Sequence, residues 1–226
     1  MVALALVWAV AELIPAAHVR DAILLRHFTV LNGPSVDRLA GTLLDLLDPL
    51  PLVVWGSLIV LYGLVRGRHR ESLAAAAIIV LSPASADRLK PLLAHAHSHA
   101  DGVHIGAASW PSGHAAAALA LVLAAMLLVS RRARPVVATV GAAFALAVGC
   151  ALLIQGWHMP SDVLGGYLVA GLWTALAVAG LRVVQRGRGT AAAAKESARP
   201  GTRAASPAQP APEPWAPGSH SGSDPS

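Results

Sequence analysis

Long uncharged stretches of apolar residues alternate with short polar segments along most of this chain. A helix that crosses a bilayer needs about 17–25 mainly apolar residues, and several stretches reach or approach that length. Together they predict six helices, of which the first and the third are the shortest. The six stretches are residues 1–11, 49–65, 72–86, 112–130, 135–157 and 163–181.

The segment between the first two apolar stretches, residues 15–48, mixes charged and apolar residues. Its leucines at 39, 43, 46 and 47 recur at helical spacing and predict an amphipathic helix. Such a helix either lies on the outer membrane surface or is an ordinary helical connector, and the pattern fits both. The first apolar stretch does not read as a secretory signal, because no Lys or Arg precedes it and Glu12 follows it closely.

Composition strengthens the membrane interpretation. Hydrophobic residues make up 55% of the 226 positions and charged residues only 13%, against about 25% charged in soluble domains. We therefore expect an all-α integral membrane bundle of about six transmembrane helices. From about Thr190 the chain is rich in Pro, Ala and Ser without a period, which predicts a disordered tail. The predicted parts are a first helix and connector (1–48), a membrane core (49–185) and a cytoplasmic tail (186–226).

The net charge of +5 is concentrated in every second connection. Arginines cluster at residues 66–70, 131–134 and 182–188, and short basic loops are typical of the cytoplasmic side. The connections around 15–48, 91–111 and 156–162 are then expected to face outward, with both termini inside. No basic surface beside aromatic residues is evident, so we expect no nucleic-acid partner. Cys150 is the only cysteine, which excludes an intrachain disulfide.

Titratable residues gather at the helix ends that this topology places outside. Asp87 and Lys90 end the third stretch, His114 begins the fourth, and His158 and Asp162 join the fifth to the sixth. Ionisable groups at membrane helix ends are costly and often functional. Their convergence on one face of the membrane indicates a site.

Two short motifs carry the candidate chemistry. In "GWHMPSDVLGG" His158 and Asp162 are four residues apart, so the carboxylate can fix the tautomer of the imidazole and leave its other nitrogen free to attack. In "PSGH" Ser112 and Gly113 precede a helix whose free N–H groups can bind an anion, and His114 can donate a proton. Each motif also has a purely structural interpretation. The first could be a capped helix with an interfacial His–Asp hydrogen bond, and "PSGH" could be a helix cap followed by an interfacial histidine.

Together these residues resemble the type 2 phosphatidic acid phosphatase family, which shares its site with the vanadium haloperoxidases. That family's pattern begins with a Lys and an Arg-Pro after six intervening residues. Pro-Ser-Gly-His follows, and then Ser-Arg with a His and an Asp four beyond it. Lys90 matches the start of the first part, Pro111–His114 the whole second part, and His158 and Asp162 the end of the third. The resemblance covers about residues 50–185.

The resemblance implies an integral membrane phosphatase that acts on a lipid phosphate at the outer membrane face. His158 would attack phosphorus and form a phospho-histidine, Asp162 would orient it, and His114 would protonate the leaving group and then activate water. Lys90, Ser112 and the Gly113 N–H would hold the phosphate oxygens. The mechanism needs no cofactor or metal. Candidate substrates are phosphatidic acid, phosphatidylglycerol phosphate and polyprenyl phosphates or diphosphates, and the lipid bilayer itself is an expected partner.

Both arginines of the family pattern are missing. His97, followed by Ser98, stands where the first is expected, and Leu152, preceded by Ala151, stands where the second is expected. Arginine is the natural partner of phosphate because its fork donates two hydrogen bonds and keeps its charge. The second functional hypothesis is therefore a catalytically impaired relative that binds phospholipid head groups or serves as a membrane scaffold or transport accessory.

A histidine-rich loop, "HAHSHADGVH", contains His97 and offers a replacement for the lost charge. Protonated imidazoles would supply it only at mildly acid pH, given an ordinary pKa near ~6.5. Zinc binding and a merely polar outward loop are the alternatives for this segment. Its histidines are His95, His97, His99 and His104.

Overall fold

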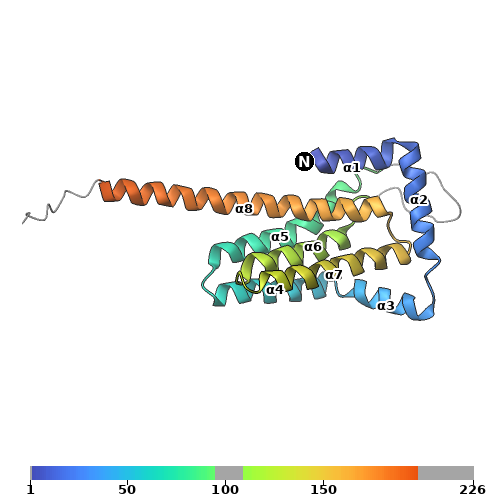
Figure 1. Ribbon diagram of the computed structural model, residues 1–226, viewed down its shortest axis with the longest axis horizontal. Coiled ribbons are helices and arrows are strands. Elements are labelled where there is room, and N and C mark those ends of the chain that lie inside the picture. The colour runs from blue at the N-terminus through green and yellow to red at the C-terminus, as the bar shows by residue number, and fades with distance from the viewer. Residues whose placement is uncertain (1, 95–108, 198–226) are drawn as a thin grey trace, which may run out of the picture. The chain divides into compact units, whose positions relative to one another are not determined.

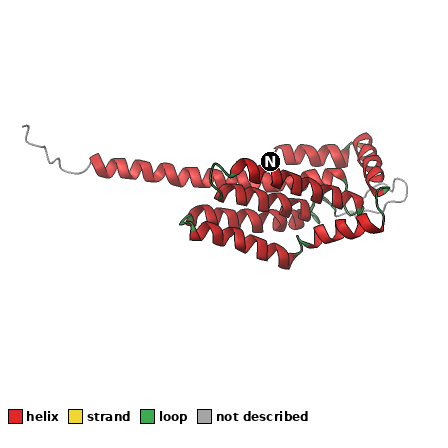
Figure 2. Cartoon of the chain, turned by 60° about the horizontal axis from the view of Figure 1, so that its bottom comes forward, coloured by secondary structure: helices red, strands yellow, loops and turns green. Residues whose placement is uncertain are grey.

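The structure is a computed structural model, and it describes residues 2–94 and 109–197. Within these two ranges every regular element is an α-helix, which confirms the predicted all-α fold (Figures 1 and 2). In chain order the helices are α1 (Val2–Leu13), α2 (Pro15–Thr29), α3 (Pro34–Asp45), α4 (Pro49–Val65), α5 (His69–Leu89), α6 (Gly113–Leu128), α7 (Arg134–Ile154) and α8 (Pro160–Ser197).

Every predicted apolar stretch lies largely within a helix, and the stretch 49–65 coincides with α4. In the described part of the chain α5, α7 and α8 are long and apolar enough to cross a bilayer, and α3 with α4 forms a fourth candidate span bent by 55°. The other two helices of the predicted six, α6 and α1, have 16 and 12 residues. Both are shorter than a usual span.

The ends of α4 and α7 are closed by the same kind of turn. A glycine follows each helix in the left-handed region, Gly67 with a φ of 70° and Gly156 with a φ of 66°. After α7 the N–H of Gly156 donates to the Leu153 carbonyl and the N–H of Trp157 donates to the Leu152 carbonyl, both at 3.1 Å. This is a Schellman motif, which satisfies the last carbonyls of the helix. It also sets the direction in which the chain leaves α7 toward the candidate site.

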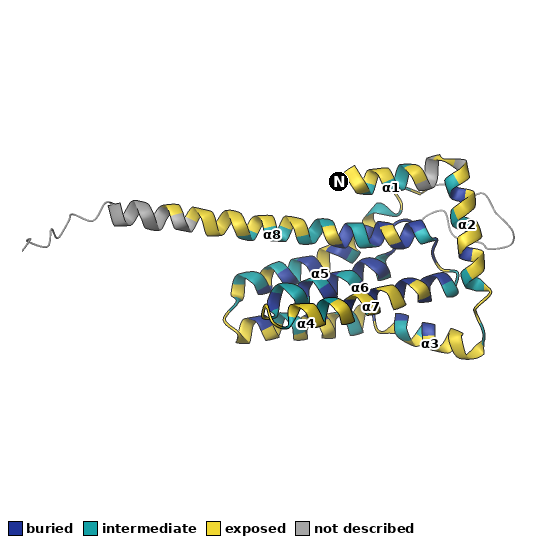
Figure 3. Ribbon diagram, in the orientation of Figure 1, coloured by how far each residue is buried: buried dark blue, intermediate teal, exposed yellow. Residues whose placement is uncertain are grey.

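Helix α6 lies at the centre of the bundle and contacts α4, α5 and α7. Its alanines 115–118 are almost completely buried (Figure 3). Such small side chains let neighbouring helices approach closely. Helix α8 is tied to this core by polar side chains: the Tyr167 hydroxyl donates to the Ala145 carbonyl of α7, and the Trp173 Nε1–H donates to Ser85 Oγ of α5 at 2.9 Å.

The predicted amphipathic segment is helix α3, and it is a packed connector rather than a helix exposed along its whole leucine face. Ala40, Leu44 and Leu47 are buried against the core, while Leu39 is 73% exposed. Helix α3 packs on α7, so its buried face is set by that neighbour. Of the predicted leucines, Leu47 is buried and Leu39 is exposed, so packing on α7 covers only part of the leucine face.

The chain divides into two compact units, Met1–Arg186 and Gly187–Ser226. Helix α8 continues to Ser197, past residue 186 where the sequence predicted a disordered tail to begin. Four consecutive alanines at 191–194 are strong helix formers and account for the extension. The rest of the predicted tail, residues 198–226, lies outside the described residues.

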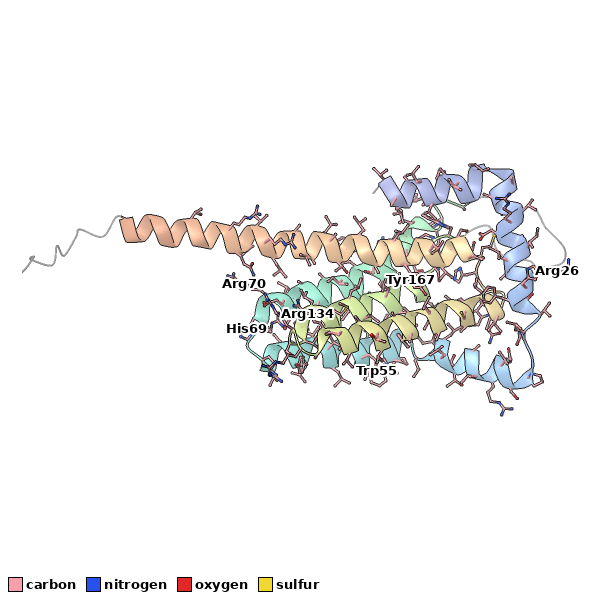
Figure 4. The ribbon with its side chains drawn as sticks, in the orientation of Figure 1. Arg26, Trp55, His69, Arg70, Arg134 and Tyr167 are labelled. Carbon is pink, nitrogen blue, oxygen red and sulfur yellow. The ribbon has the colours of Figure 1, made fainter. Side chains whose placement is uncertain are left out.

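Two of the three arginine clusters lie at one end of the first unit. Figure 4 shows His69, Arg70 and Arg134 near one another at the turns of α4–α5 and α6–α7, and Arg26 at the opposite end. The two turns are joined by Arg68, whose Nη1 donates to the Leu128 carbonyl at 2.6 Å. The alternation of basic and non-basic connections in the sequence therefore corresponds to two different ends of the bundle.

Candidate functional site

The candidate site begins at the junction of α7 and α8. His158 Nδ1 lies 3.2 Å from Asp162 Oδ2, and the same oxygen accepts a hydrogen bond from the Met159 N–H at 2.9 Å. Asp162 is completely buried and His158 is 8% exposed. The other oxygen of Asp162, Oδ1, has no hydrogen-bond partner within the described residues. The predicted contact is therefore present, and it is made by a carboxylate that reaches back from the first turn of α8 to a histidine that precedes the helix.

The loop that contains "PSGH" is attached directly to the first turn of α8. The Ser112 N–H donates to the Asp162 carbonyl at 2.9 Å, and the Trp110 Nε1–H donates to the Ser161 carbonyl at 3.2 Å. Ser112 is also the N-cap of α6, where its Oγ accepts from the Ala115 N–H at 3.3 Å. The two motifs, some 45 residues apart in the sequence, therefore form one structural unit.

The closeness of these two segments depends on a pair of glycines in α8. A Cβ at Gly165 would lie 2.7–2.9 Å from three atoms of the Trp110 ring. A Cβ at Gly166 would collide with the Ser112 carbonyl oxygen. The "GG" of the second motif is thus the surface on which the "PSGH" loop rests.

His114 occupies the first turn of α6, beside the His–Asp pair. Its Nε2 lies 3.8 Å from Asp48 Oδ1, and its ring meets the Trp157 ring edge-on at a centroid distance of 6.0 Å. Trp157 directly precedes His158, so this ring contact places His114 next to the His–Asp pair. The structure therefore brings the three predicted catalytic residues into one neighbourhood.

Lys90 and Gly113 face each other across the gap between α5 and α6. The Lys90 ammonium lies 2.8 Å from Asp87 Oδ1. A Cβ at position 113 would lie 3.0 Å from that oxygen and 3.8 Å from Lys90 Nζ. Glycine at this position leaves room for the Asp87–Lys90 pair beside the start of α6.

A groove with a volume of about 710 Å³ runs from this polar end along α4 and α5. Asp48, Asp87, Lys90 and His114 line its polar end. His158 does not line the groove, but the ring of its neighbour Trp157 contacts His114, which does. The remaining wall is mainly apolar and includes Leu52, Val53, Val60, Leu61, Ile79 and Val80.

The structure describes one of the two positions where the family pattern has an arginine, Leu152, and not the other, His97. Leu152 is completely buried among the apolar residues of the core, so its side chain packs there. His97 lies outside the described residues, as do His95, His99 and His104, so the replacement by a histidine stays a prediction. Arg88 is exposed and does not line the groove. Of the described residues that line the groove, Lys90 is therefore the one lysine or arginine.

Three acidic residues contribute to this neighbourhood that the predicted mechanism gave no role. Asp48 contacts His114, Asp87 contacts Lys90, and Asp21 of α2 contacts Ser161. Asp87 was visible as a charge at a helix end, and Asp48 precedes a proline as a helix-start signal. Asp21 had no local signal, because its partner is 140 positions away. Within the described residues no group of three His, Cys, Asp or Glu side chains is arranged to hold a metal ion.

Comparisons with known proteins bear on the fold and on the family of this chain. The fold is similar to the crystal structure of a transmembrane PAP2 type phosphatidylglycerolphosphate phosphatase from Bacillus subtilis. The TM-score is 0.65 and the sequence identity 20%, over 81% of this chain and 94% of that one. No curated protein matches in sequence. The sequence profile of the PAP2 superfamily matches residues 68–185, more than half of the chain, and the chain therefore belongs to the PAP2 superfamily.

Proposed function

We propose that this protein is an integral membrane phosphatase that hydrolyses a phosphomonoester or diphosphate of a lipid. The observation that carries the proposal is the buried His158–Asp162 pair beside His114, a residue that lines the polar end of an apolar groove. Membership of the PAP2 superfamily and a fold similar to that of a phosphatidylglycerolphosphate phosphatase support a phosphatase function. Phosphatidic acid, phosphatidylglycerol phosphate and polyprenyl phosphates or diphosphates are the substrate candidates.

The first chemical step uses the free nitrogen of His158. With its proton on Nδ1 and directed at Asp162 Oδ2, His158 presents Nε2 to phosphorus. The Nε2–P bond forms as the P–O bond to the lipid breaks, and protonated His114 gives its proton to the leaving oxygen. The buried carboxylate stabilises the positive charge that develops on the imidazole. The product is a phospho-histidine and the dephosphorylated lipid.

The second step removes the phosphoryl group with water. His114, now neutral, takes a proton from a water molecule whose oxygen attacks phosphorus. The N–P bond breaks, inorganic phosphate leaves, and both histidines return to their starting states. Each transfer places charge on the equatorial phosphate oxygens, and the protein must neutralise it. Lys90, the Gly113 N–H and the Ser112 hydroxyl are the proposed donors, with His97 as a further one.

The groove fits the tails of a lipid substrate. Its wall beyond the polar end is formed by aliphatic side chains of α4 and α5, and these helices would be surrounded by lipid in a bilayer. A lipid could therefore keep its chains against this wall while its phosphate reaches Lys90 and His114. A water-soluble phosphate ester would gain nothing from such a surface.

We also infer that the site faces outward and that the tail is cytoplasmic. The arginine-rich turns of α4–α5 and α6–α7 lie at one end of the bundle, and the α7–α8 junction lies at the other. Short basic loops accumulate on the cytoplasmic side. This orientation places His114 and His158 at the outer face of a multi-pass cell-membrane protein.

A second candidate function is head-group binding without turnover. The observation in its favour is the scarcity of positive charge that could bind phosphate. Lys90 is paired with Asp87, and a buried leucine, Leu152, stands where the family pattern has an arginine. A single phosphate-clamping arginine can be worth ~10³-fold or more in rate. In this case the protein would serve as a phospholipid-binding scaffold or transport accessory.

Release of inorganic phosphate by the purified protein in detergent separates the two functions. We expect turnover of at least one lipid from the candidate panel between pH 5 and pH 7.5. The His158→Ala variant should be slower by at least ~10³-fold, because it lacks the nucleophile. Equal rates for the two proteins would overturn the phosphatase proposal. Retained binding of vesicles that contain the same lipid would then favour the head-group binder.

A further inference from the structure

Helix α8 begins without the side-chain cap that usually satisfies a helix start. Pro160 is its first residue and has no N–H, and the side chain of Met159 before it has no oxygen that could accept a hydrogen bond from the first turn. The next free donor is the Ser161 N–H. The residue that follows Ser161 is Asp162, the partner of His158, so the geometry of this turn controls the candidate site.

The missing acceptor is supplied by another helix. The Asp21 carboxylate of α2 accepts the Ser161 N–H, at 3.2 Å to Oδ1 and 3.3 Å to Oδ2. It also accepts the Ser161 hydroxyl at 2.5 Å to Oδ2. A carboxylate at a helix N-terminus is favoured by the helix dipole. Asp21 therefore acts as an N-cap that comes from a distant part of the chain.

Ser161 is held on its other side as well. Its carbonyl accepts from the Trp110 indole, and the Asp162 carbonyl accepts from the Ser112 N–H. The first turn of α8 is thus fastened to α2 by Asp21 and to the "PSGH" loop by two hydrogen bonds. Loss of either fastening would let the turn move relative to His158.

Burial makes this position costly for a carboxylate. Desolvation by burial raises the pKa of the Asp21 carboxyl above its ordinary value, and the negative charge of Asp162 raises it further. The hydrogen bonds from the Ser161 hydroxyl and N–H, together with the charge of His18, lower this pKa but do not cancel the rise. A neutral residue would avoid this cost. The carboxylate is thus held near Asp162 by the contacts with Ser161.

We propose that Asp21 is a positioning residue for the His158–Asp162 pair and acts through Ser161. The inference rests on the proposed phosphatase function. It extends the site to α2, which lies outside residues 68–185 that match the superfamily profile. A displacement of about 1 Å at a reacting group can cost ~10²-fold in rate. Asp21 should therefore affect the chemical step and leave binding of the lipid in the groove nearly unchanged.

The test compares Asp21→Ala, Asp21→Asn and Ser161→Ala in the phosphate-release assay. We expect Asp21→Ala to lower kcat by ~10- to 100-fold with KM within ~2-fold. Asp21→Asn should fall by less than ~5-fold, because its amide oxygen still accepts from the Ser161 N–H. Asp45→Ala, which removes an exposed carboxylate at the end of α3, is the matched control and should behave as wild type.

A double-mutant cycle tests whether Asp21 affects kcat through its contact with Ser161. If Asp21 acts through Ser161, the effects of Asp21→Ala and Ser161→Ala on kcat will be less than multiplicative in the double variant. Hydrogen–deuterium exchange should also be faster in the first turn of α8 in Asp21→Ala than in Asp45→Ala. This second measurement gives an answer even for a variant with no detectable turnover.

The outcomes that overturn the inference are specific. A wild-type kcat in Asp21→Ala, a change confined to KM, or fully multiplicative effects in the cycle would each exclude a positioning role. Unchanged exchange at the first turn of α8 would exclude it as well. Failure of the phosphatase proposal is seen separately, as equal rates for wild type and His158→Ala.

Discussion

At the scale of single residues, two carboxylates and one ammonium group lie near His114. Lys90 is paired with Asp87 at 2.8 Å, and a second carboxylate, Asp48, faces His114. A lipid phosphate adds further negative charge to this neighbourhood. Asp87 and Asp48 are more than half exposed, so water screens them and their individual effects are modest.

Removal of the charge on Asp87 should improve substrate binding. The Asp87→Asn variant frees Lys90 to interact with phosphate and removes a negative charge beside Gly113. We expect KM for an anionic lipid phosphate to fall by about 2- to 5-fold, as for an exposed ion pair. Measurement of KM at low salt and at 0.5 M salt checks that the effect is electrostatic, because the fall in KM should shrink as salt screens the charges. Asp45→Asn is the control, and a KM equal to wild type in both variants would contradict the prediction.

At the scale of elements, the start of α8 is the part of the fold on which the site depends most. It follows the Schellman turn at Gly156, receives Asp21 from α2, and presents Gly165 and Gly166 to the "PSGH" loop. The helical stretches themselves follow from apolar length and were predictable. The close approach of α8 to the loop was not, because it depends on the absence of two Cβ atoms.

Substitution of Gly166 should separate these two elements. In Gly166→Ala the new Cβ meets the Ser112 carbonyl oxygen and the Ala116 nitrogen, which belong to the backbone and cannot move alone. We expect the variant to be destabilised by about 1–3 kcal/mol through overpacking, with a lower Tm in detergent and loss of turnover.

The same helix offers a matched control for this substitution. A Cβ at Gly171 meets nothing within 4 Å, so Gly171→Ala should keep or slightly raise the Tm, because alanine is the better helix former. Equal Tm values for the two variants would show that α8 and the loop are less tightly packed than the structure indicates.

At the scale of the whole molecule, the two ends of the bundle differ in charge and in role. The turns of α4–α5 and α6–α7 carry most of the arginines in the membrane core, while the opposite end carries the candidate site. Ser130, in the α6–α7 turn, is exposed at the arginine-rich end, and Asn32, between α2 and α3, is exposed at the end that carries the site. Their accessibility in cells therefore reports the orientation of the site.

Single cysteines can measure this orientation, because Cys150 is the only native cysteine. In a Cys150→Ala background we expect Asn32→Cys to react with a membrane-impermeant maleimide on intact cells. Ser130→Cys should react only after the cells are permeabilised. The reverse pattern would place the site in the cytoplasm and contradict the positive-inside inference.

The sequence by itself determined the helical architecture and the residues of the two motifs. Apolar length predicted the stretches that became α4, α5, α7 and α8, because helix formation in a membrane depends on local composition. The spacing of His158 and Asp162 predicted their contact, which forms because the Asp162 carboxylate reaches back from the first turn of α8 to the residues just before the helix. These features depend on neighbours within a few positions, which a single sequence displays directly.

Only the tertiary structure decided which other groups surround these motifs. It brought Asp21 to Ser161 over 140 positions and Asp48 to His114, and it buried Leu152 in the core. It also decided which part of the predicted leucine face α7 covers. Such contacts depend on how helices dock, and docking is set by the summed packing of many small side chains rather than by any local pattern.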